Sequence, residues 1–302
     1  MNDSVLITGA SGLVGTRLTE ILLESGYRVA HLGRKKRSQK DVESYTWDIQ
    51  AGFVEPGALE NANIVIHLAG AGVADQRWTE NRKKVIPESR VQSTRLLYDK
   101  LKALPKNDGV FISASAIGIY GWDTGDQWVD ENAPKGEGFL ADVTEAWEQE
   151  INRLNELDMR VVMMRIGIVL SDKGGALSKI APSVRYYAGA PLGSGQQYMS
   201  WIHIDDLCNM FVKAIEDVNL SGAYNAVAPN PVTNQDFMKS LAKVMNKKLW
   251  LPSVPSWALN LITGEMGQML IGGNRVSSKR IVSTGFNFKF AEVEETMRSL
   301  LK

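Results

Sequence analysis

The stretch Thr8-Gly-Ala-Ser-Gly-Leu-Val-Gly15 lies near the start of the chain, between a short apolar run and an amphipathic segment. Gly9 permits a tight turn, Gly12 lets the backbone approach a pyrophosphate, and Gly15 lets a helix pack closely on the preceding strand. The N-terminus of that helix would present free N–H groups and a positive dipole end to the anion. Because the pattern follows an expected strand and opens an expected helix, it favours dinucleotide binding over an ordinary turn.

Strand-like and helix-like patterns alternate on either side of this turn. Apolar residues 5–8 precede it, and amphipathic residues 13–24 and apolar residues 28–32 follow it. This alternation is typical of a parallel sheet with crossover helices. Further strands are expected at 64–68, 109–113 and 160–165, and further helices at 80–104 and 141–157. The near-continuous apolar strands suit burial on both faces. We therefore predict an α/β fold with a doubly wound parallel Rossmann sheet.

The pattern changes after residue 171, where loops containing glycine and proline surround shorter elements. A helical region rich in Met and Leu follows Pro231. We predict a Rossmann domain over residues 1–230, with an excursion near 171–200 toward the second lobe. A smaller substrate-side lobe is expected over residues 231–302.

Composition excludes several classes of protein. The 302 residues are 44% hydrophobic and 23% charged, which is enough apolar material for a sizeable core. The 34 basic residues balance 34 acidic ones, so no global field favours nucleic acid or an anionic membrane. Cys208 is the single cysteine, and three scattered histidines offer no metal-ligand spacing. No apolar run reaches the roughly 18 residues of a membrane helix, and the first apolar run belongs to a strand. We expect a cytoplasmic protein without a metal.

A basic run follows the second expected strand, at the place that decides between two dinucleotides. NAD sites usually have a carboxylate there for the ribose hydroxyls, whereas NADP sites need cations for the extra phosphate. This chain has Gly33 and then Arg34-Lys-Lys-Arg37. Arg34 can bind a phosphate with its fork of donors, with Lys35 or Arg37 as a second cation. A solvated basic loop is the alternative, but the position, about 20 residues after the turn, favours NADP(H).

Other motifs extend the pattern: Asp48 after the third strand, His67-Leu-Ala-Gly70, Ser113-Ala-Ser115 before Tyr120-Gly121, and Trp201-Ile-His-Ile-Asp205-Asp206. With the glycine turn, they resemble the short-chain dehydrogenase/reductase superfamily, and in particular its extended, nucleotide-sugar-epimerase-like members. The resemblance covers essentially the whole chain. Finer motifs are similar to one atypical branch with a characteristic C-terminal domain, whose members carry the labels "epimerase family protein" or "cell division inhibitor".

The resemblance implies roles for individual residues. Asp48 would lie by the adenine, Leu68-Ala-Gly70 would line the cofactor, and the Ser115 hydroxyl would orient a substrate carbonyl. Ser115 and Tyr120 are the predicted catalytic residues. The predicted NADP(H)-binding residues are Thr8, Gly9, Ser11, Gly12, Leu13, Val14, Gly15, Arg34, Lys35, Asp48, Leu68, Ala69, Gly70, Ser113 and Arg165.

The chain also departs from the family pattern. Family enzymes carry a Tyr-x-x-x-Lys pair in which the lysine lowers the pKa of the tyrosine for proton exchange with the substrate. Leu140 and Thr144 occupy those positions, and Arg90 replaces the family's active-site asparagine. Any proton would need another donor. The titratable candidates are Tyr120, Asp142, Glu145 and Glu131, each of which also has a structural interpretation.

Several residues near the expected cleft have competing interpretations. The tryptophans at 78, 122, 128, 147 and 201 could stack on a substrate, but core packing is the simpler expectation. His203 is expected to brace a loop between the lobes, and Asp205-Asp206 to cap a helix that begins near Leu207. Cys208 is expected to be buried on that helix.

Two classes of function follow from these residues. One is an NADP(H)-dependent oxidoreductase or epimerase-like enzyme with a small substrate between the lobes. The other is a regulator or scaffold that binds NADP(H) without turnover, which the loss of Tyr and Lys favours. Neither class requires nucleic acid or a membrane as partner, and a homodimer is compatible with both.

Overall fold

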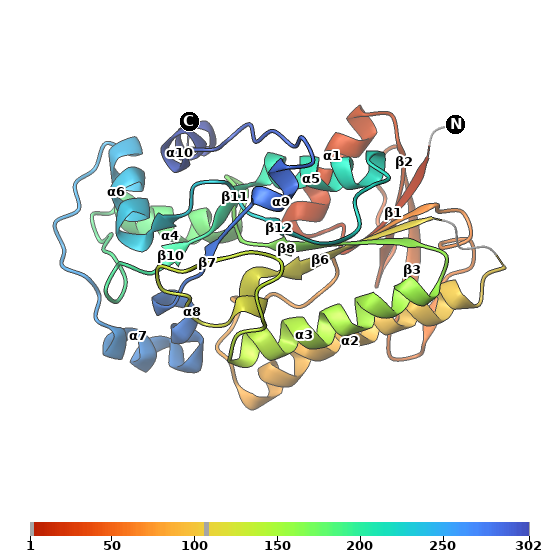
Figure 1. The fold of residues 1–302 in the computed structure, drawn as a ribbon, viewed down its shortest axis with the longest axis horizontal. Coiled ribbons are helices and arrows are strands. Elements are labelled where there is room, and N and C mark those ends of the chain that lie inside the picture. Colours follow the sequence, from red (N-terminus) through yellow and green to blue (C-terminus); the bar gives the residue numbers. More distant parts are fainter. Residues whose placement is uncertain (1–2, 106–108, 302) are drawn as a thin grey trace.

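An eight-stranded sheet forms the centre of the computed structural model, which describes residues 3–105 and 109–301 (Figure 1). Its strand order is β12-β8-β6-β5-β1-β2-β3-β4. All neighbours are parallel except β3 and β4. The strands are β1 (Ser4–Thr8), β2 (Arg28–Gly33), β3 (Val42–Asp48), β4 (Phe53–Val54), β5 (Ile64–His67), β6 (Val110–Ala116), β8 (Arg160–Ile166) and β12 (Gly222–Ala226). The predicted Rossmann sheet is therefore confirmed.

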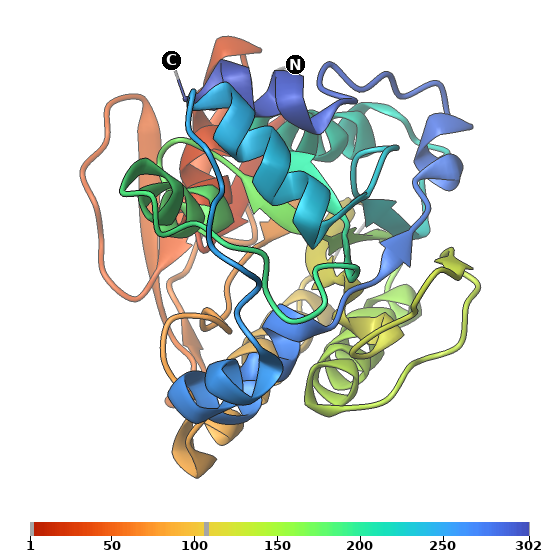
Figure 2. The same ribbon diagram turned by 90° about the vertical axis from the view of Figure 1, so that its left-hand side faces the viewer.

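Helices cover both faces of this sheet, which explains its continuous apolar strands (Figure 2). On β1, Val5 and Ile7 pack into the hydrophobic cluster that also contains buried residues of α1 and α5. Leu6, between them, packs into the cluster on the other face, beneath α2 and α3. These four helices are α1 (Leu13–Glu24), α2 (Glu80–Lys102), α3 (Phe139–Asn152) and α5 (Ile204–Glu216).

A second lobe lies beyond the carboxyl ends of the central strands β6, β8 and β12 (Figure 1). Three two-stranded pairings belong to it or join it to the sheet domain: β10 with β13, β9 with β11, and β7 with β14. Its elements are β7 (Trp128–Val129), β9 (Ile168–Leu170), α4 (Gly175–Arg185), β10 (Tyr198–Met199), β11 (Trp201–His203), β13 (Val232–Thr233), α6 (Asn234–Val244), α7 (Ser256–Thr263), α8 (Gln268–Ile271), β14 (Arg275–Val276), α9 (Lys279–Val282) and α10 (Val293–Leu300). Short 3-10 turns are η1 (Ile117–Tyr120), η2 (Arg153–Glu156) and η3 (Gly264–Gly267).

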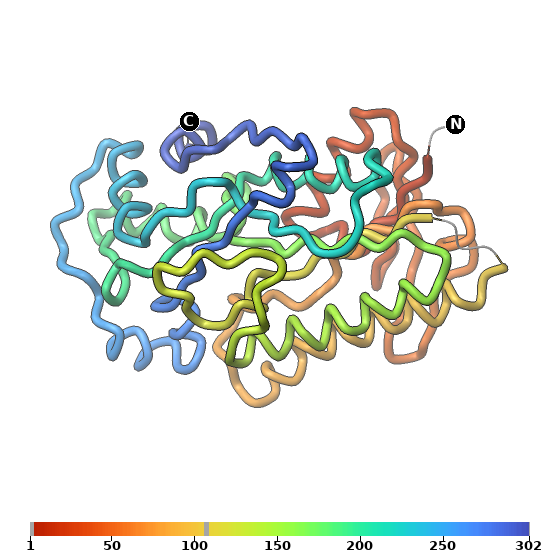
Figure 3. Tube along the Cα trace, in the orientation of Figure 1, coloured from red at the N-terminus to blue at the C-terminus, as the bar shows by residue number. Residues whose placement is uncertain are grey.

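The final part of the chain returns from this lobe to the sheet domain (Figure 3). Ile281 and Phe286 join the same cluster as Val5 of β1. The buried carboxylate of Asp206 on α5 accepts hydrogen bonds from the backbone N–H groups of Lys289 and Phe290 at 3.0 and 2.9 Å. The segment 281–290 thus completes the core on the α1 and α5 face, although it lies in the sequence of the expected C-terminal lobe.

None of the helices in the described ranges combines the length and the apolar composition needed to cross a membrane.

Candidate functional site

The glycine turn joins β1 to α1 and leaves the first N–H groups of α1 available. Gly9 has φ of +68°, and a Cβ there would lie 2.7 Å from the carbonyl carbon of Leu68. A Cβ on Gly15 would lie 2.6 Å from the Cα of Ala10. Gly12 is the N-cap of α1, without a side-chain cap. The fold therefore requires glycine at 9 and 15, while the helix end at Gly12 remains open to an anion.

Thr8 and His67 brace the loop after β5 against this turn. The Thr8 hydroxyl lies 2.7 Å from Nδ1 of buried His67 and accepts from the N–H groups of Leu68 and Ala69. The Nε2 atom of His67 is within 3.2 Å of two hydroxyls on α2. The structure thus brings the predicted cofactor-lining segment 68–70 directly beside Gly9.

The ends of β2 and β3 carry the residues expected around the adenosine. Arg34 and Lys35 are exposed, and within the described part of the chain no partner is found for either side chain. Lys36, in contrast, is paired with Glu55 at 2.6 Å. Asp48 ends β3, and its Oδ1 accepts from the N–H groups of Gln50 and Ala51. Arg34 and Lys35 are therefore free to receive a phosphate, and the side chain of Arg37, also exposed and unpaired in the described residues, remains the alternative second cation.

A buried polar network contains both predicted catalytic residues. The Ser115 hydroxyl donates to Glu148, whose carboxylate is bound by Nε and Nη2 of Arg165 at 2.9 and 2.8 Å. Arg165 Nη1 donates to the hydroxyl of Tyr120 at 3.0 Å, which in turn donates to Asn225 at 2.7 Å. Every one of these side chains is buried. The arrangement links β6, α3, β8, η1 and β12 at one end of the sheet.

This network limits what its members can do. Ser115 donates its only hydroxyl hydrogen to Glu148, so the lone pairs of its oxygen can accept a hydrogen bond from a substrate hydroxyl. To donate to a substrate carbonyl, the Ser115 hydroxyl would have to rotate away from Glu148. Burial raises the pKa of Tyr120 even though Arg165 opposes the rise. Although burial opposes it, the hydrogen bonds to Glu148 raise the pKa of Arg165. Ser113 is fully buried and donates to the carbonyl of Ala114. Cofactor contacts of Ser113 and Arg165 remain predictions.

The positions of the family's Tyr and Lys lie in packed surroundings. A Cβ on Gly118 would lie 3.3 Å from Cβ of Leu140 and 3.4 Å from Oγ1 of Thr144. The Thr144 hydroxyl donates to the carbonyl of Leu140 within α3. The other acid candidates on this helix, Asp142 and Glu145, are paired with Lys135. Neither Leu140 nor Thr144 carries a group that can exchange a proton as the family's tyrosine does.

Arg90 lies at the family's asparagine position on α2. Its Nη1 donates to the carbonyls of Ala71 and Ile86, and its guanidinium stacks over the ring of Trp147 with its carbon 5.2 Å from the centroid. Burial and the nearby charge of Arg82 lower the pKa of Arg90 to about 10. The side chain therefore remains a cation at neutral pH.

A cavity of about 490 Å³ adjoins the glycine turn. Its walls include the turn residues Ser11, Gly12 and Leu13, which the sequence assigns to the cofactor. The cations on the wall are already engaged: Arg17 pairs with Asp205 at 2.7 Å and with Glu20 at 2.9 Å. The remaining lining residues are Thr16, Ser171, Asp172, Lys173, Gly174, His203, Ile204, Ser299 and Leu300. The cavity opens at the uncapped end of α1.

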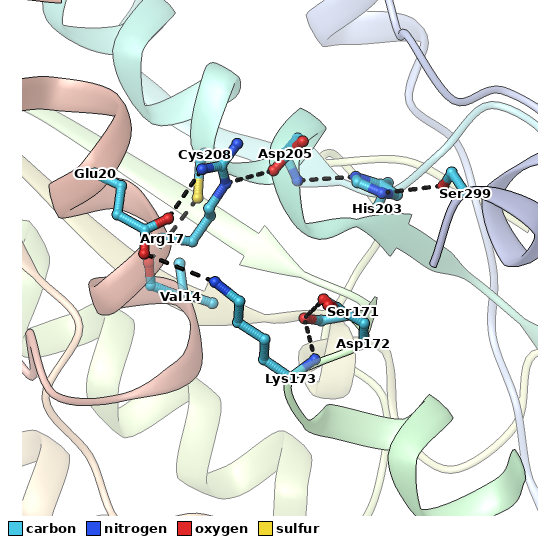
Figure 4. Close-up of polar contacts among 10 residues, drawn as sticks. All are labelled: Val14, Arg17, Glu20, Ser171, Asp172, Lys173, His203, Asp205, Cys208 and Ser299. Atoms are coloured by element: carbon cyan, nitrogen blue, oxygen red, sulfur yellow. Dashed lines mark hydrogen bonds and ion pairs between the residues drawn. The ribbon is translucent and has the colours of Figure 1, made fainter. Parts of the chain in front are cut away.

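His203 lies in this cavity wall but lacks the arrangement of a catalytic base. Its Nδ1 accepts from the N–H of Asp205, so its Nε2 carries the hydrogen toward Ser299, 3.5 Å away (Figure 4). His203 is the N-cap of α5, which begins at Ile204. The expected start near Leu207 with an aspartate cap was wrong, because a histidine nitrogen can also cap. Cys208 is buried on α5, as predicted.

The histidines make the stability of the fold depend on pH. Burial lowers the pKa of His67 to about 3 and that of His203 to about 4, from the ordinary 6.5. Because the unfolded chain binds these protons more readily, we expect the free energy of unfolding to fall as the pH drops from 6.5 toward 4. NMR titration should show both rings neutral at pH 5.5. A ring of the folded protein titrating near 6.5 would contradict this assignment.

Several site residues were missed by sequence reasoning. Glu148 and Asn225 were not singled out, although a charged Arg165 inside an apolar strand signals a buried partner. The expectation of aromatic packing is met at Trp78, whose ring centroid lies 4.9 Å from Phe139 and 5.9 Å from Trp122. Trp201 is fully buried, whereas Trp128 is half exposed.

Comparisons with known proteins agree with this geometry. A sequence model described as "NAD dependent epimerase/dehydratase family" matches residues 5–227. A second, described as "Domain of unknown function (DUF1731)", matches residues 254–300. The chain is 35% identical to the epimerase family protein SDR39U1 homolog, chloroplastic, of Arabidopsis thaliana over 306 residues, covering 99% of this chain and 87% of that protein.

Two further relatives span nearly their full lengths. The epimerase family protein YfhF of Bacillus subtilis is 34% identical over 303 residues, covering 99% of this chain and 98% of that protein. The crystal structure of human epimerase family protein SDR39U1 (isoform2) with NADPH has a TM-score of 0.88 and 28% identity, covering 98% of each chain. The expected resemblance, including the C-terminal domain of the branch, is confirmed.

Proposed function

Because this chain belongs to the NAD dependent epimerase/dehydratase family, we propose that it binds NADP(H) across the carboxyl ends of its parallel strands. The observation that carries the proposal is the uncapped N-terminus of α1 at Gly12. The unpaired cations Arg34 and Lys35 after β2 agree with it. The pyrophosphate would lie at the helix end, and Arg34 with Lys35 would receive the adenosine phosphate. The human relative SDR39U1, solved with NADPH, supports the choice of cofactor.

The proposed activity is that of an oxidoreductase or epimerase-like enzyme on a small molecule. When bound, the cofactor accepts or supplies a hydride. The chain would orient the substrate oxygen through Ser115, which Glu148 and Arg165 fix in place. The proposal includes a cytoplasmic location and is compatible with a homodimer.

A regulator that binds NADP(H) without turnover is the second candidate. The observation in its favour is the packing of Leu140 and Thr144 against Gly118, where a proton-relay pair would be needed. Turnover by the purified protein in a panel of alcohols and ketones separates the two candidates.

The cofactor assignment is tested by Arg34→Ala. We expect the unmodified protein to bind NADPH at least tenfold more tightly than NADH, about 1.4 kcal/mol, and the variant to lose most of that difference. Lys36→Ala is the matched control, because Lys36 is already paired with Glu55. The measurement is a fluorescence titration with each dinucleotide. Equal affinities in the unmodified protein would refute the NADP(H) assignment.

Ser115→Ala tests the proposed chemistry. With any substrate that is turned over, we expect the rate to fall by roughly a hundredfold or more. NADPH affinity should not change, because the hydroxyl contacts Glu148 rather than the glycine turn. NADPH absorbance follows the rate. Unimpaired turnover of both an alcohol and a ketone by this variant would show that Ser115 has no part in the reaction.

A further inference from the structure

The guanidinium of Arg90 is fixed at one nitrogen and unused at the opposite edge. Nη1 donates to the carbonyl oxygens of Ala71 at 3.0 Å and Ile86 at 2.9 Å. Within residues 3–105 and 109–301, Nε and Nη2 have no hydrogen-bond partner, and no carboxylate is paired with this side chain. The Nε–Nη2 edge is one that binds the two oxygens of a carboxylate or phosphate side by side. Arg90 is therefore anchored with an anion-binding edge free.

Among the described residues, no carboxylate forms an ion pair with Arg90. A Cβ on Gly70 would lie 3.3 Å from its Cζ, and Trp147 lies beneath its guanidinium. Trp147 is 5% exposed, and its Nε1 is buried without a partner. Arg82, two turns earlier on α2, donates to the carbonyl of Gly72, and its Nε is also buried without a partner. The carboxylate paired with Arg82 is exposed Asp75, 3.9 Å away.

A bound anion would stabilise the unpaired charge of Arg90. Arg90 is half-buried, and the partial burial of a cation without a counterion carries a desolvation cost that a bound oxyanion would offset. Its oxygens would accept from the free Arg90 edge, close to Gly70. Gly70 belongs to the segment 68–70, which lies beside Gly9 and which the family resemblance places along the cofactor, so the anion would lie beside the bound cofactor.

Apolar side chains adjoin the same place. Ile86, one helical turn from Arg90, belongs to a hydrophobic cluster with Val143 of α3, one turn before Trp147. The other members of this cluster are Val73, Trp78, Trp122, Phe139, Leu140, Met266 and Met269. A ligand with its oxyanion on Arg90 would therefore find mainly apolar surface, on the partly buried members of this cluster, for the rest of its body.

We propose that Arg90 binds the carboxylate or phosphate of the substrate, and that the substrate is an oxyanion joined to an apolar group. The inference rests on the proposed function, because it places the substrate beside the cofactor segment. Arg90 acts as a specificity-determining residue: it selects an anion where the family's asparagine position would hold a neutral amide.

The test compares probes of one shape that differ in charge. Benzoate and phenyl phosphate carry the two oxyanions, and benzamide is the neutral counterpart of benzoate. We expect the NADPH-loaded protein to bind benzoate or phenyl phosphate at least tenfold more tightly than benzamide. Tryptophan fluorescence measures the binding of each probe. Arg90→Gln should abolish this preference and leave NADPH affinity within twofold. Arg95→Gln is the matched control on α2, because Arg95 is paired with Glu150 at the surface.

Three outcomes would overturn the inference. Equal binding of benzamide and both anionic probes by the unmodified protein does so whether or not Arg90→Gln folds. Unchanged preference in a folded Arg90→Gln variant does so as well. A tenfold or greater loss of NADPH affinity in that variant would assign Arg90 to the cofactor's pyrophosphate instead. The titrations with the three probes are repeated without NADPH. Failure to bind NADPH, which refutes the proposed function, is thereby distinguished from failure to select the anionic probe.

Discussion

Replacement of Gly12 by valine is expected to abolish NADPH binding while the chain remains folded. Gly12 has an ordinary extended backbone with φ of −77°, and a Cβ there would meet only the carbonyl oxygen of Gly9, at 3.2 Å. The fold can therefore accommodate the substitution with a small shift. A pyrophosphate at the helix end cannot, because the valine methyl groups would occupy the space that it needs. Fluorescence titration with NADPH and thermal unfolding measure the two effects.

Gly15→Val gives the contrasting case on the same turn. A Cβ at Gly15 would lie 2.6 Å from backbone atoms of Gly9 and Ala10, so this variant should lose stability as well as binding. If Gly12→Val bound NADPH with unchanged affinity, the pyrophosphate could not lie at this turn, and the proposed function would lose its main support.

The second large effect is expected in stability. Glu148→Ala should lower the free energy of unfolding by about 3–5 kcal/mol, because it leaves Arg165 buried without its carboxylate. Glu150→Ala, two residues away on the same helix, is the matched control. Glu150 is itself largely buried, but the two arginines that it pairs with are 53% and 37% exposed and remain hydrated without it, so its loss should cost about 1 kcal/mol or less. Urea unfolding at neutral pH measures both.

A double variant separates loss of the pair from loss of one partner. Glu148→Ala with Arg165→Met removes both charges, and we expect it to recover a large part of the stability lost in Glu148→Ala. Equal losses for Glu148→Ala and Glu150→Ala would show that the buried pair contributes no more than a surface pair.

The sheet and the glycine turn could be predicted because their causes are local. Strands buried on both faces, such as β1 and β5, are almost continuously apolar, and three regularly spaced glycines identify the turn.

The contacts around the candidate site could not be predicted in the same way. Glu148 contacts Arg165, which is 17 residues away in the sequence, and Ser115, which is 33 residues away. Tyr120 contacts Asn225, which is 105 residues away. No period or motif encodes such pairs, because they depend on how helices pack on the sheet. The free edge of Arg90 is likewise invisible in the sequence, which shows an arginine but not which of its nitrogens are already bonded.

The return of segment 281–290 to the first cluster has a consequence for the time course of synthesis. A ribosome makes β1 and α1 first, yet Ile281 and Phe286, which complete their core, are among its last products. Until then the nascent chain carries an uncovered apolar face, the kind of surface that chaperones bind. Ribosome-bound chains halted before residue 281 should therefore be protease-sensitive over α1 and α5, and should gain resistance only when that segment has emerged.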